Sequence, residues 1–212
     1  MIEKLSYRMQ VREYLLSQMI LGQLVAGQSL SLAGLSRELD VSLTPIREAL
    51  TQLEQAKIVK SIPNRGFIIS DIDANEAKNI YEIIATLEAL AVEKSDFSED
   101  DIQQLIKKHR NFSVAKESAA KIQADMEFHS CLTGNYDNPF LRQIVSDLKI
   151  RSFFYEKSYM EDTEFTDISD DQHYEIIDLL KKGKSKQAAR LTKENWLTNL
   201  KHIQKHFLHI HE

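Results

Sequence analysis

Two stretches of the chain combine residue types that can bind other molecules. The first runs from Ser42 to Arg47 and holds two hydroxyls and a guanidinium within six residues. Hydroxyls and arginine are common contacts to DNA phosphates, and arginine also binds the O6 and N7 atoms of guanine. The second is the pair Asp125 and His129, which lie four residues apart and so on one face of a helix. Carboxylate and imidazole groups are ligands for zinc and similar divalent metals.

A predicted helix-turn-helix positions the first stretch. Thr44 suits a helix N-cap and Pro45 suits the first helical position. The residues after them repeat at i, i+3, i+4 and i+7, as on one apolar face of a helix: Ile46, Ala49, Leu50 and Leu53. A shorter periodic segment over 32–39 precedes them, and a tight polar turn joins the two. In a helix-turn-helix the second helix enters the major groove of DNA, although periodicity alone also allows an ordinary helical hairpin.

A predicted β-hairpin follows directly. Segments 58–62 and 67–69 are rich in β-branched and aromatic residues, and Pro63-Asn64-Arg65-Gly66 between them is typical of a turn. A hairpin in this place is typical of a wing, with Asn64, Arg65 and Gly66 at its tip as DNA contacts. Alone, the segment would better suit a solvent-exposed hairpin with an incidental arginine, and its position directly after the helix pair favours the wing.

The rest of the chain is predicted to be all helical. The chain has only six glycines and three prolines in 212 residues, so long segments lack helix breakers. We place an N-terminal domain over 1–71, with a first helix over 7–21 that ends at Gly22. A helical domain over 72–212 begins with Asp73 as a cap. Its expected helices lie near 74–94, 98–110, 115–134, 138–160, 168–182 and 185–207.

Charge and cysteine content narrow the function classes. The net charge of -5 argues weakly against nucleic acid, but residues 1–70 hold eight Lys and Arg against six Asp and Glu. A modestly basic N-terminal domain is compatible with DNA binding. One cysteine, Cys131, cannot form a disulfide framework, and no apolar run reaches the ~18 residues of a membrane span. We therefore expect a cytoplasmic protein without a membrane partner.

Residues 35–50, including Thr44-Pro45-Ile46-Arg47-Glu48-Ala49-Leu50, then Leu53 and Arg65-Gly66, resemble the winged-helix domain of GntR-type bacterial transcription regulators. The helical remainder resembles their FadR-like (FCD) ligand-binding domain. The resemblance implies a homodimer that binds a short palindromic operator in double-stranded DNA. It also implies control by a small effector, such as an organic acid, and usually a repressor.

The resemblance also implies individual contacts. DNA contacts of the family fall on Ser42, Thr44 and Arg47 and on Arg65 and Gly66 of the wing. The family commonly has arginine between the serine and the threonine, where this chain has Leu43. One cationic contact is therefore missing. We expect a shifted operator, with an apolar contact from Leu43 to a thymine methyl.

In the metal-binding branch of the family, Asp125, His129 and His173 match ligand positions, and a further histidine follows about 22 residues later. That position is Asn195, whose amide oxygen is a weaker ligand for zinc. The family often has an arginine that binds an acidic effector, and here the matching position is Ile84. Both departures indicate an altered effector pocket.

Other interpretations of the helical domain stay open. Asp125 and His129 alone would suit a hydrogen-bonded pair one helical turn apart, and His173 a satisfied core histidine. A domain that only dimerises needs neither metal nor effector. A metal held by these residues could also activate water in a hydrolytic enzyme, but no nucleophile motif or phosphate loop accompanies them.

Overall fold

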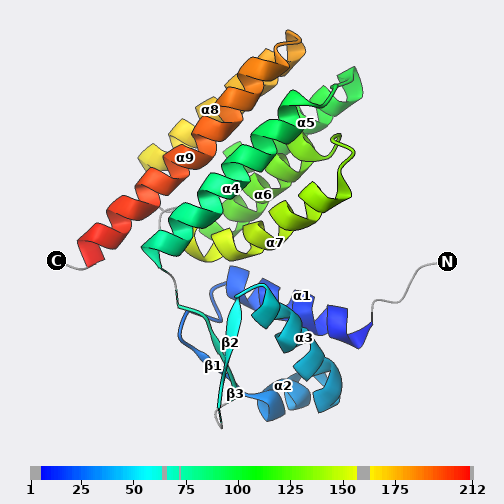
Figure 1. The fold of residues 1–212 in the computed structure, drawn as a ribbon, viewed down its shortest axis with the longest axis vertical. Helices are drawn as coiled ribbons and strands as arrows, with labels where there is room; N and C mark the ends of the chain where they lie inside the picture. The colour runs from blue at the N-terminus through cyan, green and yellow to red at the C-terminus, as the bar shows by residue number, and fades with distance from the viewer. Residues whose placement is uncertain (1–5, 64–65, 72, 157–162, 211–212) are drawn as a thin grey trace. The chain divides into compact units, whose positions relative to one another are not determined.

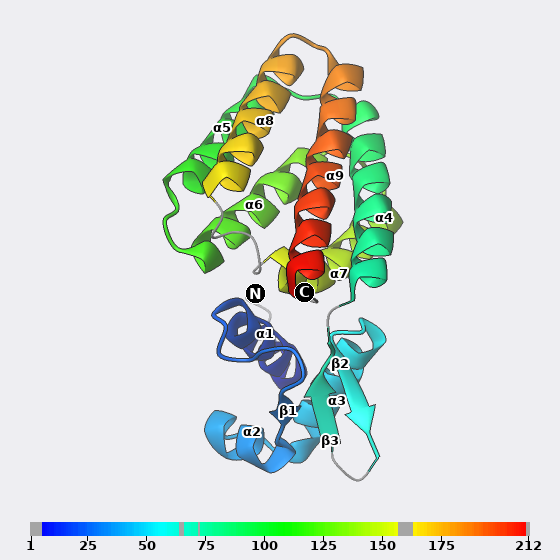
Figure 2. The same ribbon diagram turned by 90° about the vertical axis from the view of Figure 1, so that its left-hand side faces the viewer.

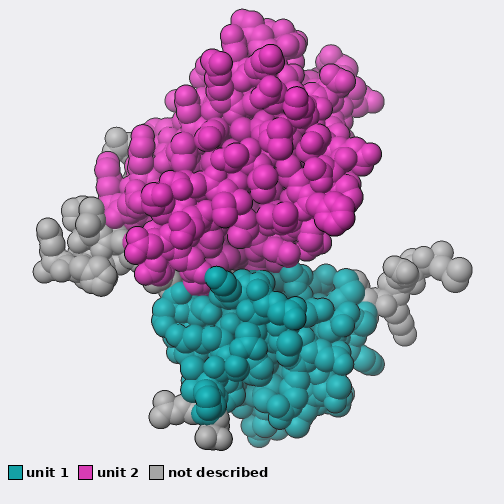
Figure 3. Space-filling view, viewed as in Figure 1, with its two compact units in different colours: residues 1–72 teal, residues 73–212 magenta. Residues whose placement is uncertain are grey.

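The computed structural model describes residues 6–63, 66–71, 73–156 and 163–210. The chain divides between residues 72 and 73 into two compact units, coloured separately in Figure 3. Both units are mainly helical, and a small sheet lies in the first. Among the described residues, no helix combines the length and apolar character needed to cross a bilayer.

The first unit is a winged helix-turn-helix, as the sequence predicts. Its elements in chain order are α1 (Tyr7–Ile20), β1 (Ser29–Leu30), α2 (Leu32–Leu39), α3 (Leu43–Gln55), β2 (Val59–Ile62) and β3 (Gly66–Ile69). The strands form an antiparallel sheet in the order β1-β3-β2, which Figure 2 shows beside α3. Strand β1 was not predicted, because two residues are too few to show a period.

The core of this unit lies between α1 and α3. Val11, Leu15 and Met19 are almost fully buried along one face of α1. They face the predicted apolar stripe of α3, all of whose members are fully buried: Ile46, Ala49, Leu50 and Leu53. Gly22 ends α1 with φ of 71°, a left-handed conformation that glycine adopts without strain. The predicted stop at Gly22 is confirmed.

The predicted start of α3 is wrong by two residues. The N-cap is Ser42 rather than Thr44, and Pro45 is the third helical residue rather than the first. The first four N–H groups of a helix have no partner within the helix, so a proline anywhere in this turn loses no hydrogen bond. Thr44 therefore lies inside the first turn instead of capping it.

The second unit is a bundle of the six predicted helices. These are α4 (Ala74–Glu93), α5 (Glu99–Val114), α6 (Ser118–Thr133), α7 (Pro139–Glu156), α8 (Thr163–Lys181) and α9 (Ser185–Ile210). The predicted cap at Asp73 is confirmed, since its carboxylate accepts the Glu76 N–H at 2.8 Å. Helix α9 packs against α4 on one side and α8 on the other, as both ribbon views show (Figure 1).

Several helix boundaries differ from prediction. Asn111 was expected to end α5, but the helix continues to Val114 because Phe112 is fully buried on its inner face. Helix α6 then begins at Ser118 rather than at 115. Residues 163–167 were expected to form a linker, yet α8 already begins at Thr163. Polar residues in the first turn of a helix resemble a loop in sequence. The periodicity of apolar residues therefore placed the start of α8 too late in the chain.

An apolar cluster fills one part of the bundle. It is formed by α4, α5, α6, α8 and α9, and its buried members are Val92, Ile102, Leu105, Phe128, Leu132, Ile176, Ile177, Leu180, Ala188 and Ala189. Burial of these aliphatic and aromatic side chains stabilises the bundle and fixes the positions of α6 and α8.

Candidate metal centre and DNA-contact surface

The N-terminal turn of α3 presents polar side chains to solvent. Ser42, Thr44 and Arg47 are all exposed. The Ser42 hydroxyl makes no capping hydrogen bond although Ser42 is the N-cap, which leaves it available to a phosphate. Leu43 stands between them with 44% of its surface exposed.

The wing is only partly described. Gly66 begins β3 with φ of 84°, pairs with Ile62 across the hairpin, and would place any Cβ 3.7 Å from the Leu30 carbonyl oxygen. The left-handed φ is the reason for glycine here. Asn64 and Arg65, the other two predicted wing contacts, lie outside the described residues.

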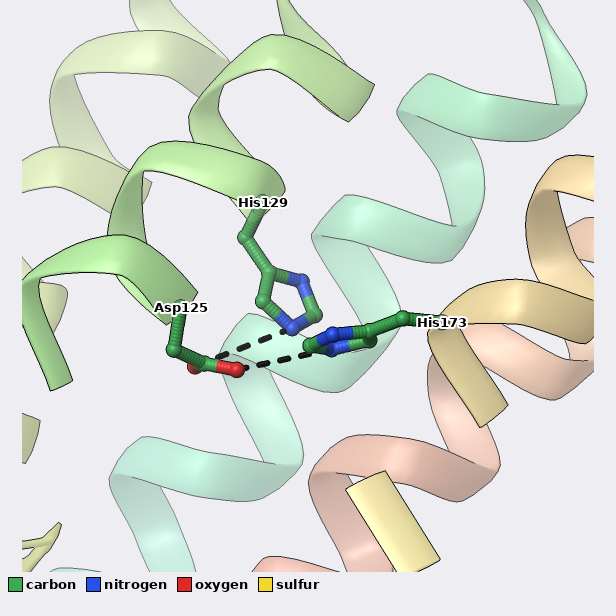
Figure 4. A group of neighbouring side chains, drawn as sticks. All are labelled: Asp125, His129 and His173. Carbon is green, nitrogen blue, oxygen red and sulfur yellow. Dashed lines mark ion pairs between the residues drawn. The ribbon is translucent and has the colours of Figure 1, made fainter. Parts of the chain in front are cut away.

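Asp125, His129 and His173 meet in the interior of the bundle. Asp125 and His129 project from one face of α6, and His173 reaches them from α8 (Figure 4). Oδ2 of Asp125 lies 3.9 Å from Nε2 of His129, and Oδ1 lies 3.4 Å from Nε2 of His173. All three side chains are at least 99% buried. The folded bundle thus brings together the three predicted ligands.

The cluster fits a divalent metal better than a hydrogen-bonded pair. One donor atom from each residue lies within 4.8 Å of the other two, and the ligands of a tetrahedral zinc ion stand about 3.4 Å apart. Oδ2 of Asp125, Nε2 of His129 and both ring nitrogens of His173 have no hydrogen-bond partner among the described residues. Buried polar atoms are rarely left unpaired, so this cluster could hold a metal ion.

The electrostatics of His173 also favour coordination. Burial lowers the pKa of its imidazole well below the ordinary value, and His129 and His109 lower it further. The ring stacks on Phe128 with centroids 4.0 Å apart. A neutral imidazole is the form that binds a metal, and the stacking holds it in one orientation.

Glu88 of α4 orients His129. Its Oε2 atom lies 2.7 Å from Nδ1 of His129 and accepts a hydrogen bond from Nε1 of Trp196 at 2.7 Å. A carboxylate on Nδ1 selects the tautomer whose Nε2 lone pair faces Asp125. This is the arrangement in which a histidine is positioned for a metal.

A buried lysine compensates the charge of Glu88. Lys149 of α7 forms an ion pair with Oε1 of Glu88. Burial by itself raises the pKa of the Glu88 carboxyl, but Lys149 and His129 more than offset this and lower it to about 2. Glu88 is therefore ionised at neutral pH although it is fully buried.

Asn195, the predicted fourth ligand, is fully buried on α9. Its Nδ2 donates to Oε1 of Gln172 at 2.9 Å, and Gln172 is the neighbour of His173 on α8. Its Oδ1 has no hydrogen-bond partner in the described part of the chain. The amide is thus held with its oxygen unpaired, which is the atom that a metal or a ligand would use.

Glu156 of α7 is a further buried acid. Its Oε1 accepts hydrogen bonds from the Tyr81 hydroxyl at 3.2 Å and the Ser152 hydroxyl at 3.3 Å. Burial raises the pKa of its carboxyl to about 8, and the charge of Asp125 contributes to the shift. Ile84, which stands where the family often has arginine, is fully buried and offers no charge.

We refer to eight buried polar side chains of the bundle as the polar interior: Glu88, Asp125, His129, Lys149, Glu156, His173, Asn195 and Asn199. The sequence indicated four of them. Glu88 could have been found, because it falls on the buried stripe of α4 between Ile84 and Ala91, where an acid is out of place. Lys149 and Glu156 lie on a helix with a weak period and gave no comparable signal.

Comparison with known proteins identifies both units. Residues 8–69 match the family described as bacterial regulatory proteins, gntR family, and residues 79–197 match the FCD domain, which spans more than half of the chain. The chain belongs to the GntR family. It is 31% identical over 187 residues to the Nta operon transcriptional regulator of Aminobacter aminovorans, covering 85% of this chain and 83% of that one. It is 25% identical to the gluconate operon transcriptional repressor of Bacillus subtilis over 155 residues, 70% of this chain and 63% of that one.

Solved structures confirm the fold of this GntR-family chain. A putative GntR regulator from Rhodococcus sp. RHA1 superposes with a TM-score of 0.83 at 20% identity, covering 95% of this chain and 99% of that one. McbR/YncC of Escherichia coli gives 0.80 at 20% identity, covering 96% and 100%. The related proteins are transcription regulators rather than enzymes, so the hydrolytic alternative is set aside, and membership of the family implies DNA binding.

Proposed function

We propose that this GntR-family regulator is a repressor that binds a palindromic operator as a homodimer. Arg47 would bind in the major groove, and the hydroxyls of Ser42 and Thr44 would bind phosphates beside it. The wing residues Asn64, Arg65 and Gly66 would contact the DNA backbone nearby. The exposed N-terminal turn of α3 supports this assignment. The names of the Nta operon regulator and the gluconate operon repressor support control of an operon.

The DNA contact can be tested at Arg47. The full-length protein is used to select an operator from random double-stranded DNA, and affinity is then measured by fluorescence anisotropy. Arg47→Ala is expected to weaken binding to the selected operator by ~1–3 kcal/mol. Lys193→Ala removes an exposed cation from α9 and serves as the control. Equal affinity of the Arg47 variant and the wild type would refute the assigned recognition helix.

Leu43 gives a finer test of the same surface. An exposed leucine at the start of α3 suits the C5-methyl group of a thymine. Replacing each operator thymine with uracil removes that methyl alone and is expected to cost about 0.8 kcal/mol at one position. In Leu43→Ala the cost at that position is expected to vanish. A wild-type protein insensitive to every such replacement would contradict the contact.

We propose that the FCD domain binds a divalent metal such as zinc and a small carboxylate effector. Asp125, His129 and His173 would hold the metal, with Asn195 as a weaker fourth ligand. The observation that carries this proposal is the buried cluster whose facing atoms have no hydrogen-bond partner among the described residues. A bound metal would supply a Lewis-acidic position for an effector carboxylate.

The metal can be tested by elemental analysis of protein purified without chelator. Wild-type protein is expected to retain about one zinc ion per chain, and Asp125→Ala and His173→Ala to retain little. His109→Ala is the matched control, because His109 is a nearby histidine that pairs with Asp170 and offers no ligand atom to the cluster. Thermal melting establishes that each variant folds. If the wild-type protein neither retains zinc nor takes it up on titration, the metal site is refuted and the domain that only dimerises is the remaining interpretation.

A further inference from the structure

Two buried amides of α9 retain polar atoms without a hydrogen-bond partner among the described residues. Asn195 and Asn199 are one helical turn apart and are both at least 99% buried. Oδ1 of Asn195 and both polar atoms of the Asn199 amide have no hydrogen-bond partner in the described ranges. Leaving buried amides unpaired costs free energy unless a ligand pairs with them.

Glu156 belongs to the same part of the interior. The Trp196 ring, between the two asparagines in sequence, packs edge-on against the Tyr81 ring with centroids 5.5 Å apart. The Tyr81 hydroxyl donates to Oε1 of Glu156. Oε2 of Glu156 is fully buried and has no hydrogen-bond partner among the described side chains. Hydrogen-bonding atoms thus remain available on α7 and α9. Glu156 lies close enough to Asp125 to be affected by its charge, and Asn195 binds the residue that precedes His173.

The described cations of this interior are already paired. Lys149 forms its ion pair with Glu88, and Arg151 binds Glu76 at 2.6 Å through Nη2. A ligand carboxylate away from the metal would therefore meet amides and a carboxyl group rather than a positive charge. Burial of an uncompensated carboxylate is far more costly than burial of hydroxyls, each of which can donate and accept hydrogen bonds.

We propose that Asn195, Asn199 and Glu156 form a subsite for the hydroxyl groups of the effector, which is a polyhydroxylated monocarboxylate rather than a dicarboxylate. This ligand class rests on the proposed function, since its single carboxylate is assigned to the metal. Its hydroxyls pair with the amides of α9 and with Oε2 of Glu156. The subsite itself does not require the metal.

Three six-carbon acids distinguish the possibilities. Isothermal titration calorimetry is carried out on the full-length protein with D-gluconate, hexanoate and adipate. Gluconate carries hydroxyls, hexanoate has the same carboxylate without them, and adipate has a second carboxylate. Gluconate is expected to bind at least about tenfold more tightly than either of the others, because its hydroxyls can form several hydrogen bonds that the other two acids cannot form.

Variants assign the preference to the subsite. Asn199→Leu is expected to reduce the gluconate-to-hexanoate ratio to within about threefold. The substitution replaces an unpaired buried amide with an apolar group of similar size, so the stability of the fold is not expected to fall. Thr192→Val is the matched control, because the buried Thr192 hydroxyl already donates to the Ala188 carbonyl. Glu156→Gln is a second variant that retains shape and is expected to lower the ratio less.

Several results would overturn the proposal. These are tighter binding of adipate than gluconate, an unchanged ratio in Asn199→Leu, or failure of all three acids to bind. The same titrations on zinc-loaded and zinc-free protein separate this proposal from the metal site. Zinc dependence of the affinity for all three acids tests the metal, whereas the ratio between gluconate and hexanoate tests the subsite and is expected to persist without zinc.

Discussion

The helical unit contains two interiors of opposite character that share the same helices. The apolar cluster uses α4, α5, α6, α8 and α9 and contains only aliphatic and aromatic side chains. The polar interior uses α4, α6, α8 and α9 as well, and adds α7 in place of α5. Phe128 belongs to the first and stacks on His173 of the second. One domain thus holds a conventional core directly beside a set of buried charges.

The difference indicates which interior serves stability and which serves binding. Apolar burial stabilises a fold without further requirements, whereas each buried ion or amide must first be paired. Glu88 pairs with Lys149 and with Nδ1 of His129. In contrast, Nε2 of His129 and atoms of Asp125, His173 and Asn199 have no hydrogen-bond partner among the described residues. The paired set positions the unpaired set. We therefore expect the two interiors to respond differently to substitution.

The largest effect is expected from breaking the Glu88–Lys149 pair. Glu88→Gln and Lys149→Met each leave one buried charge uncompensated, so each is expected to lower the free energy of unfolding by about 4 kcal/mol. The amide oxygen introduced by Glu88→Gln can still accept a hydrogen bond from His129 or Trp196. The double variant leaves no unpaired charge and is expected to recover most of the loss. Urea unfolding of chelator-treated protein measures all three, and losses that simply add would show that the two residues act independently.

A cavity in the apolar cluster is expected to lower stability without changing zinc or effector binding. Leu105→Ala removes a fully buried side chain of α5 and is expected to lower the free energy of unfolding by about 3 kcal/mol. Zinc content and effector affinity should not change, because Leu105 belongs to the apolar cluster, on a helix that contributes no side chain to the polar interior. Urea unfolding and elemental analysis of the same preparation compare the two properties. Loss of zinc in the folded variant would show that the two interiors are not separable.

The N-terminal unit could be predicted from sequence because its determinants are local. The apolar stripe of α3, the stop at Gly22 and the hairpin between β2 and β3 each depend on residues close together in the chain. The misplaced N-cap at Thr44 reflects two nearby residues, Ser42 and Thr44, that are both good caps. Strand β1 was missed because it exists only through its pairing with β3.

The candidate metal centre was predicted in part, for a different reason. Asp125 and His129 are one turn apart and His173 followed from resemblance, but the distances among them depend on how α6 and α8 are placed in the bundle, where both pack against α5. Glu88 and Lys149 are 61 residues apart in sequence and meet only in the folded bundle. Long-range pairing of this kind leaves no periodic signal. The groups that orient the ligands were therefore found only in the structure.

A smaller effect is expected from the pH dependence of the polar interior. The pKa of the Glu156 carboxyl is about 8 in the folded protein, against an ordinary value of 4.5. The folded state keeps this proton while the unfolded state releases it, so the stability that Glu156 contributes is lost as pH rises from 4.5 towards 8. In Glu156→Gln this loss is absent. Relative to the wild type, the variant is therefore expected to gain at most about 1.4 kcal/mol for each pH unit across that range.

Urea unfolding of chelator-treated protein between pH 5 and pH 8 measures this difference. Subtracting the wild-type curve removes the contribution of His173. The pKa of His173 is lowered in the folded protein, so this residue reduces stability as the pH falls below the ordinary pKa of histidine, which is a slope of the opposite sign. Asp147→Asn, near the surface of the same helix, is the control and should leave the slope unchanged. Parallel curves for Glu156→Gln and the wild type would show that Glu156 is ionised in the folded state. The subsite would then present a carboxylate, which accepts hydrogen bonds from ligand hydroxyls and repels a second ligand carboxylate directly.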